Sequence, residues 1–420
     1  IIDFNNNIII NLDSYSEENQ MKIEMQENKE IYKMNYTPHC TIEIEKDKEF
    51  LVFLQEERYF MRLDYVNDLL YVYTMEDIVQ EEYRFKRISS TFFKDDKDPA
   101  YFYLSAVDKQ NDLHIYRISN QLNEIEKVDT FHGKNSPPHT TMKIKNCLIM
   151  SHEFTEAKYL LRNTNTIISD REMGALLVKI EMKINAKYPH QDALIKKREI
   201  SKIIHEKYDV ECIPSKIMLL DLLTKERVTY ETSGSNAAHF VFDVKTNMLY
   251  VSSHNFFDGG DSVYMFEPAI LDKFELVDNR LILRGTFKYD KGYRYTSHRI
   301  FYNDGKSYLC TFGKPNRLLF IDPEDMTLSF YYDIGEDELS NNDELEVYLN
   351  SRHEDKNAAS EFIALEVSKD GENIFFLDSK YLFIFNFKER TITHKIDYTN
   401  NEIANGDDYK LITFHMNYLE

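Results

Sequence analysis

The fold is decided by residues 297–328, which read SHRIFYNDGKSYLCTFGKPNRLLFIDPEDMTL. This stretch holds apolar and aromatic runs separated by short polar turns, and Asp304-Gly305 separates the first two runs. Asp-Gly between two such runs indicates a tight hairpin, because the turn needs residues that tolerate positive φ. We therefore predict four antiparallel strands, at 298–302, 307–312, 317–322 and 328–334.

The same alternation of strands and turns recurs at 240–267 and at 362–396. Four-stranded units that repeat every 40 to 60 residues or so are typical of propeller blades. Candidate innermost strands begin near His39, Ile88, His139, His239, His298, Glu361 and Lys410. We predict a single all-β domain over residues 1–420, a seven-bladed β-propeller. Strand 411–417 would close the ring by joining N-terminal strands at 8–12 and 21–25, which removes exposed sheet edges.

The interval between His139 and His239 is too long for one blade. We assign the excess to an insertion at 155–211 between strands of the third blade, with an amphipathic helix at 193–208. This insertion either covers a flank of the propeller or acts as a lid or partner-docking element. An eighth blade around 176–184 is the alternative. The acidic segment 336–359 lacks periodicity and is expected to be a surface loop.

Two stretches resemble the blades of YVTN and NHL-type β-propellers: AAHFVFDVKTNMLYVSSHN (237–255) and residues 297–328. In those families a Pro-His-Gly-like opening precedes the innermost strand, and a second strand of the LYVS type follows the turn. This chain departs from the pattern, since no glycine follows any of the four strand-opening histidines. The histidine placements are also similar to those of metal-binding propellers of the selenium-binding-protein type. The resemblance implies an architecture rather than an activity.

Composition narrows the classes of partner. The net charge of −21 argues against nucleic acid or an anionic membrane as the main partner. No apolar run approaches the roughly 20 residues of a membrane span. The four cysteines are Cys40, Cys147, Cys212 and Cys310. No CxxC pair is present, which argues against a cysteine zinc site. We expect the cysteines to be reduced, as in a reducing compartment. We expect a cytoplasmic protein.

Histidines recur at equivalent places in the predicted blades. His39, His139, His239 and His298 open innermost strands, and His152 and His254 end the strands that return to the same face. Imidazole suits Zn, Cu, Fe and Ni, so we predict that the four strand-opening histidines bind a divalent transition metal. His152 and His254 would be the catalytic acid–base groups. Three further residues would contact substrate on the same face: Arg294, Tyr295 and Glu361.

Two other interpretations of these histidines remain open. A histidine before a strand often only hydrogen-bonds nearby backbone and fixes a loop, and a metal-free binding or acid–base role is the third reading. The first functional hypothesis is therefore a metal-dependent enzyme, a lyase, hydrolase or oxidase acting on a small molecule. The alternative is a non-enzymatic platform that binds a protein partner.

Overall fold

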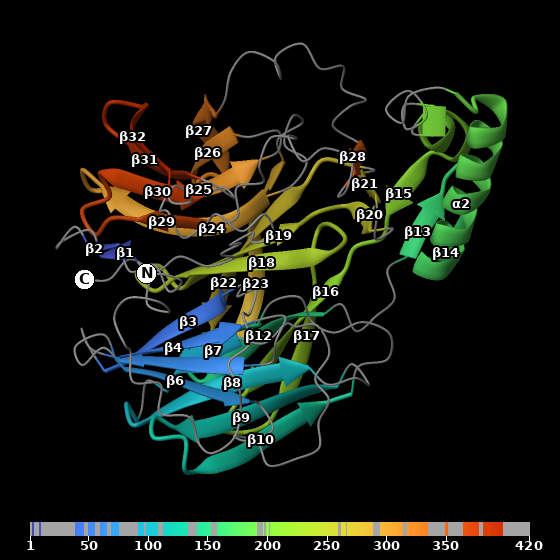
Figure 1. Ribbon diagram of the computed structural model, residues 1–420. Helices are drawn as coiled ribbons and strands as arrows, with labels where there is room; N and C mark the ends of the chain where they lie inside the picture. The colour runs from blue at the N-terminus through green and yellow to red at the C-terminus, as the bar shows by residue number, and fades with distance from the viewer. Residues whose placement is uncertain are drawn as a thin grey trace. The chain divides into compact units, whose positions relative to one another are not determined.

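Figure 1 presents the computed structural model of the chain. The residues that it describes are 2–3, 8–9, 38–45, 49–54, 59–64, 69–74, 91–95, 98–107, 112–132, 141–152, 158–190, 196, 199–200, 202–258, 262–265, 267–288, 295–313, 317–334, 349–351, 364–377 and 381–397. The chain divides into two compact units, which are described separately. Unit 1 comprises residues 1–133 and 360–420, and unit 2 comprises residues 134–359.

The described part of unit 1 holds three four-stranded antiparallel sheets, each made of strands consecutive in sequence. The first contains β3 (Pro38–Glu45), β4 (Glu49–Leu54), β5 (Tyr59–Asp64) and β6 (Leu69–Thr74). The second contains β7 (Thr91–Lys94), β8 (Tyr101–Val107), β9 (Leu113–Ser119) and β10 (Ile125–Phe131). The third contains β29 (Ala364–Val367), β30 (Asn373–Leu377), β31 (Tyr381–Asn386) and β32 (Thr391–Asp397). Two short strands, β1 (Ile2–Asp3) and β2 (Ile8–Ile9), pair with each other.

Unit 2 also has three four-stranded antiparallel sheets among its described residues. One contains β11 (Thr141–Ile144), β12 (Cys147–His152), β16 (Lys216–Asp221) and β17 (Arg227–Glu231). The next contains β18 (Ala237–Asp243), β19 (Met248–Ser253), β22 (Ile270–Val277) and β23 (Arg280–Lys288). The last contains β24 (Tyr295–Asn303), β25 (Lys306–Gly313), β26 (Arg317–Asp322) and β27 (Thr327–Asp333).

Two three-stranded sheets interrupt this series. The chain leaves the first sheet after β12 and forms β13 (Lys158–Leu161), β14 (Thr166–Ser169) and β15 (Val210–Cys212) before β16. It leaves the second sheet after β19 and forms β20 (Phe256–Asp258) and β21 (Ser262–Met265), which pair with β28 (Leu349–Ser351). Two of the three main sheets of unit 2 are therefore meanders with an excursion after the second strand, and the third is an uninterrupted meander.

The hairpin that decides the fold forms as predicted. Asp304 and Gly305 both have positive φ, 49° and 77°, as a two-residue turn of the type I′ requires. The register runs from Tyr302 opposite Ser307 to Arg299 opposite Cys310. The strand predicted at 317–322 has the same bounds in the structure.

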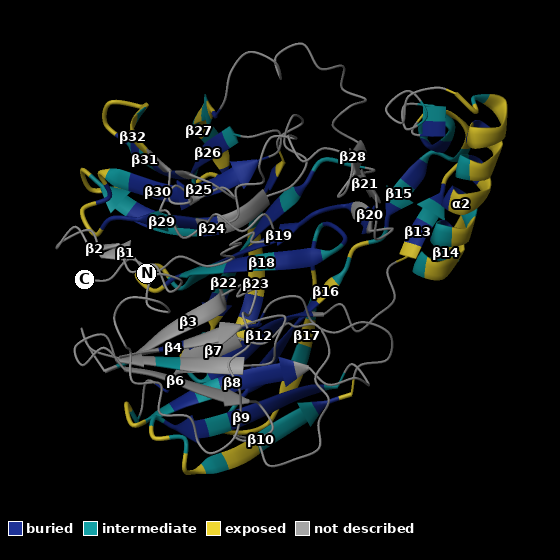
Figure 2. Cartoon of the chain, viewed as in Figure 1, coloured by how far each residue is buried: buried dark blue, intermediate teal, exposed yellow. Residues whose placement is uncertain are grey.

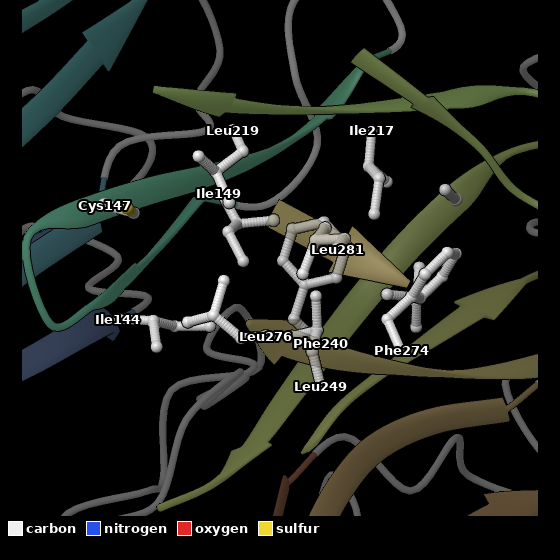
Figure 3. Packing of buried hydrophobic residues seen from close by; sticks show 12 residues of the cluster. Ile144, Cys147, Ile149, Ile217, Leu219, Phe240, Leu249, Phe274, Leu276 and Leu281 are labelled. Carbon is white, nitrogen blue, oxygen red and sulfur yellow. The ribbon is translucent and has the colours of Figure 1, made fainter. Parts of the chain in front are cut away.

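The sheets of unit 2 pack face to face through apolar side chains. Figure 3 shows the cluster between the first two sheets, where Ile149 and Leu219 meet Phe240, Leu249 and other buried residues. Tyr250 and Leu271, on the opposite face of the middle sheet, pack against Leu309 and other residues of the β24–β27 sheet. Side chains that alternate between the two faces of β19 thus contribute to two cores, as the period of two in a strand requires.

Helix α2 (Asp170–Lys187) covers the small sheet of β13, β14 and β15. Its N-terminus has a capping box, in which the Ser169 hydroxyl accepts from the Glu172 backbone N–H and the Glu172 carboxylate accepts from the Ser169 N–H. Met173 and Leu177 are among the residues that fill the core below the helix, while the outer face is exposed (Figure 2). Within the described ranges, no helix is long and apolar enough to span a membrane.

The prediction of a seven-bladed β-propeller is wrong, although the all-β character is confirmed. The described strands form separate small sheets, and none of these sheets closes or curls into a propeller. The N-terminal strand β2 pairs with β1 rather than completing a blade, and the proposed closing strand 411–417 lies outside the described residues. Hairpin turns determine pairing within a meander, but they do not determine how one meander lies against the next.

Two smaller predictions are also corrected, and two others fall partly or mostly outside the described residues. The strand expected at 262–267, as part of the repeat at 240–267, does not join β18 and β19: residues 262–265 form β21 of a separate sheet, and β22 takes its place. The alternative of an eighth blade around 176–184 is wrong because this segment belongs to α2. The amphipathic helix expected at 193–208 is described only in part, and it ends in a π-helical turn, Ile204–Tyr208. Most of the acidic segment 336–359 lies outside the described residues, apart from β28.

Candidate histidine site in unit 2

Three histidine rings meet between the β18–β23 sheet and the β24–β27 sheet. The ring centroids of His239 and His254 are 5.3 Å apart, and those of His239 and His298 are 6.0 Å apart. His254 and His298 are each 1% exposed, whereas His239 is only partly buried. His254 and His298 are therefore closed off from solvent, and Nε2 of His239 is buried as well, although the residue as a whole keeps some exposure.

Antiparallel pairing explains why His239 and His254 meet. His239 lies near the start of β18, and His254 directly follows β19, the next strand of the same sheet. His239 is opposite Ser252 in the register, so the residue two positions further along the chain lies at the same end of the hairpin. His298 comes from β24, the first strand of the neighbouring sheet, which lies against β18.

The two strands that carry His239 and His298 each contain a β-bulge. The register of β18 shifts between Ala237 and His239, and the register of β24 shifts between Thr296 and Arg299. In unit 1, β3 shifts in the same way between Pro38 and Cys40. A β-bulge re-aims a side chain relative to the regular pleat and occurs often beside functional sites. Sequence reasoning located the histidines but missed the bulges.

The side chain of His298 is held by one specific contact. Its Nδ1 lies 2.7 Å from Oγ1 of Thr311 on β25, and the Thr311 hydroxyl is 3.4 Å from the Phe312 carbonyl oxygen. If that hydroxyl donates to the carbonyl, Nδ1–H of His298 donates to Thr311, which leaves a lone pair on Nε2. Nε2 is buried and has no hydrogen-bond partner among the described residues.

Burial keeps the His298 ring neutral. Loss of hydration, together with the smaller effect of the adjacent Arg299 charge, lowers the pKa of His298 to about 3. Arg299 also donates from Nη1 to the His298 carbonyl oxygen at 2.8 Å. At neutral pH, His298 therefore presents an uncharged imidazole, the form that binds metal ions.

A buried hydroxyl adds to the polar character of the site. Ser252 is fully buried and lies directly opposite His239 in the β18–β19 ladder, on the same face of the sheet. Within the described part of the chain its Oγ has no hydrogen-bond partner. Buried polar atoms without protein partners usually contact water, an ion or a ligand. Ser252 was not among the predicted site residues, although Ser252-Ser253 directly precedes His254.

A buried polar loop fixes the backbone beside His254. The His254 N–H donates to the Asn236 carbonyl, and the Ser235 N–H donates to Oδ1 of Asn255 at 2.7 Å. Asn255 also donates from Nδ2 to the Pro268 carbonyl. A Cβ on Gly234 would lie 2.8 Å from both Asn255 Oδ1 and Ser253 Cβ, so this close approach requires glycine.

The other predicted site residues are not brought into this cluster by the described geometry. His39 lies in β3 of unit 1, and His152 ends β12 of unit 2, but their side chains are not described. The same holds for Tyr295 at the start of β24. His139, Arg294 and Glu361 lie outside the described residues.

The three rings are not arranged as a formed metal site. Among the residues that the structure describes, no group of three or more His, Cys, Asp or Glu side chains is placed to hold an ion. The spacing is nevertheless close to what a shared ion needs. Two imidazoles bound to one tetrahedral ion, with metal–nitrogen distances of about 2.0–2.1 Å, have ring centroids about 5 Å apart.

Comparisons with known proteins do not identify the chain. No family model matches it, and no curated protein matches it. Among solved structures, it is similar to a functionally unknown protein from Desulfotomaculum acetoxidans DSM 771. The TM-score is 0.45 and the sequence identity 11%, over 84% of this chain and 80% of that one. This likeness assigns neither a fold nor a function to the chain.

Proposed function

We propose that unit 2 binds a divalent transition metal through His239, His254 and His298, and that the protein is a metal-dependent enzyme acting on a small molecule. One observation carries the proposal: Nε2 of His298 is buried, neutral and without a partner among the described residues, while Thr311 holds Nδ1. A hydrogen bond on one ring nitrogen that fixes the other for a ligand is the usual arrangement of metal-binding histidine.

To share an ion, the rings would have to turn toward a common point. The terminal torsion of histidine is broad, so a ring can turn without leaving its side-chain rotamer. Thr311 restrains His298, whereas His239 keeps partial exposure as a residue and has its Nε2 buried. We assign His254 a ligand role in place of the acid–base role expected from sequence, because its ring lies 5.3 Å from that of His239.

Three histidine ligands leave a coordination position open. A zinc or related ion held in this way supplies Lewis acidity and lowers the pKa of a bound water. Ser252 would offer its hydroxyl to a group bound beside the ion, since it lies opposite His239. Lyase, hydrolase and oxidase chemistry all use such a site. Cytoplasmic placement fits the three described cysteines, which are free and buried.

The test is metal content and metal titration of protein purified without a histidine tag. We expect a stoichiometric transition ion by elemental analysis, and visible absorption bands when Co²⁺ is added to chelator-treated protein. His298→Gln and His254→Gln should abolish both signals. His132→Gln is the matched control, because His132 is exposed and pairs with Asp112 in unit 1. Absence of metal uptake by the parent protein, or equal uptake by the variants, would falsify the proposal.

A further inference from the structure

The outer face of helix α2 carries exposed apolar side chains beside a row of lysines. Val178 and Met182 are 54% and 68% exposed, although they follow each other at helical spacing on one face. Ala175 and Ala186 extend this row and are also exposed. We define these four residues as the apolar ridge. By helical spacing it lies opposite the buried residues of α2, which are Met173, Leu177, Ile180 and Ile184.

A row of lysines runs along one side of the ridge. Lys179, Lys183 and Lys187 are spaced four residues apart and are all exposed. Lys187 lies over the Tyr188 ring at 4.6 Å, but Lys179 and Lys183 form no ion pair with any described residue. Like charges four residues apart on a helix repel each other, so this row is unfavourable unless anions approach it. The chain as a whole has a net charge of −21.

The helix that carries the ridge is firmly anchored. Its N-terminus is capped by Ser169, and the Tyr159 hydroxyl donates to the Asp170 carboxylate at 2.9 Å. Its inner face packs into a core that includes Tyr159 and Phe257 from two different sheets. The outer face is therefore a preformed surface, so binding would lose little conformational entropy.

We propose that the apolar ridge and the lysine row of α2 bind an acidic amphipathic helix of a partner protein. The ridge is narrow and made of small or flexible side chains, which allow another helix to approach closely and pack between the residues. Methionine adapts well to such surfaces. Carboxylates on the partner would then lie along Lys179 and Lys183, and the partner's apolar residues would cover Val178 and Met182.

The composition of the face favours a protein over a lipid surface. Helices that lie on membranes present large apolar residues such as Trp, Phe and Leu. The ridge has none of these, and Val178 and Met182 are its largest residues. Binding of an acidic peptide and binding of lipid vesicles distinguish a protein partner from a membrane.

The probe is a fluorescein-labelled synthetic helix of about 20 residues, with leucines on one face and glutamates beside them, long enough to be helical. Its binding is followed by fluorescence anisotropy at low salt. We expect saturable binding to the full chain, weakened at least about tenfold by 0.5 M salt, since exposed charges are then screened. A peptide with glutamine in place of glutamate should bind much more weakly.

Two double variants locate the binding surface. Val178→Gln with Met182→Gln removes the ridge, and Lys179→Gln with Lys183→Gln removes the free charges, while glutamine keeps helix propensity. Each should weaken peptide binding at least about tenfold. Val244→Gln and Lys388→Gln are matched controls, because both residues are exposed elsewhere and should leave binding unchanged. Circular dichroism and thermal unfolding check that every variant folds.

Two results would overturn the proposal. The first is that the acidic peptide does not bind the parent chain, or binds the α2 variants equally well. The second is that phosphatidylserine vesicles bind the parent chain but not the α2 variants, and that the peptide binds neither. This result would show that the face binds a membrane. Neither result depends on metal content, so this proposal and the metal site fail independently.

Discussion

Thr311 Oγ1 lies 2.7 Å from Nδ1 of His298, and this pair joins the first two strands of one sheet at the place where β24 is bulged. Both side chains are buried. The contact fixes the orientation of a neutral imidazole whose other nitrogen has no partner in the described part of the structure. Thr311 is therefore a positioning residue for the candidate site, and its role can be separated from packing.

We predict that Thr311→Val destabilises the protein by about 1–3 kcal/mol, because it leaves a buried ring nitrogen unsatisfied while it conserves volume. Thr311→Ser keeps the hydroxyl and should cost less, in spite of the lost methyl group. Urea unfolding of the two variants measures the difference. Cobalt affinity should follow the same order, and equal behaviour of the two variants would show that only packing matters at this position.

The protonation of His298 predicts a pH dependence. Its folded-state pKa is lowered to about 3, so between that value and about pH 6.5 the unfolded chain takes up a proton that the folded chain does not. This contribution to stability is complete above about pH 6.5 and is lost as the pH falls, by about 1.4 kcal/mol per unit. His298→Gln removes the titration. From pH 6.5 to pH 5, the parent chain should lose about 2 kcal/mol more than the variant in urea unfolding.

Other titrating groups are common to both proteins and cancel in this comparison. A variant at His298 whose stability falls with pH as steeply as that of the parent would mean that the ring is not buried as a neutral group.

Two glycine substitutions should act in opposite directions. Gly234→Ala places a Cβ 2.8 Å from atoms of Ser253 and Asn255, next to His254, and should destabilise by about 1–3 kcal/mol. Gly174→Ala lies within α2 and meets only Phe257 Cζ at 3.4 Å, an ordinary contact. It should stabilise by about 0.5–1 kcal/mol through helix propensity. Thermal unfolding gives both signs, and a stabilising Gly234→Ala would show that the loop can move.

The capping box of α2 predicts a local effect. Ser169→Ala removes the acceptor for the Glu172 N–H and should cost about 1 kcal/mol. Asn185→Ala, on the exposed face of the same helix, should be neutral or slightly stabilising. Amide hydrogen exchange in the first turn of α2 reports the loss directly. Unchanged exchange in Ser169→Ala would mean that packing alone sets the start of the helix.

Local structure followed from the sequence where turn chemistry was explicit. Asp304-Gly305 fixed a hairpin, and the strand at 317–322 has the predicted bounds. The prediction failed where tertiary packing chose between similar apolar segments. Residues 262–265 and 270–277 both suit a strand, but only the second supplies Leu271 and Phe274 to the cores on the two faces of its sheet. The Ser169–Glu172 capping box was visible in the sequence and was overlooked.

Part of the candidate site could be predicted from the sequence, because strand pairing determines which residues meet at the end of a hairpin. His239 and His254 converge because antiparallel strands bring the start of one and the end of the next together. The contribution of Thr311 and Ser252 depends on the bulges of β24 and β18, and no residue pattern in a single sequence reports a bulge of this kind. The local sequence pattern determines the arrangement of the sheets even less, and the propeller prediction was wrong for this reason.

The division of the chain also constrains the order of folding during synthesis. Unit 2 is continuous, from residue 134 to residue 359, whereas unit 1 combines residues 1–133 with 360–420. A ribosome therefore releases all of unit 2 before the last sheet of unit 1 exists, and domains generally fold as they emerge. The first two sheets of unit 1 must wait, with one partner sheet missing, while the histidine-bearing unit is completed. Chaperone dependence and premature truncation should accordingly affect unit 1 before unit 2.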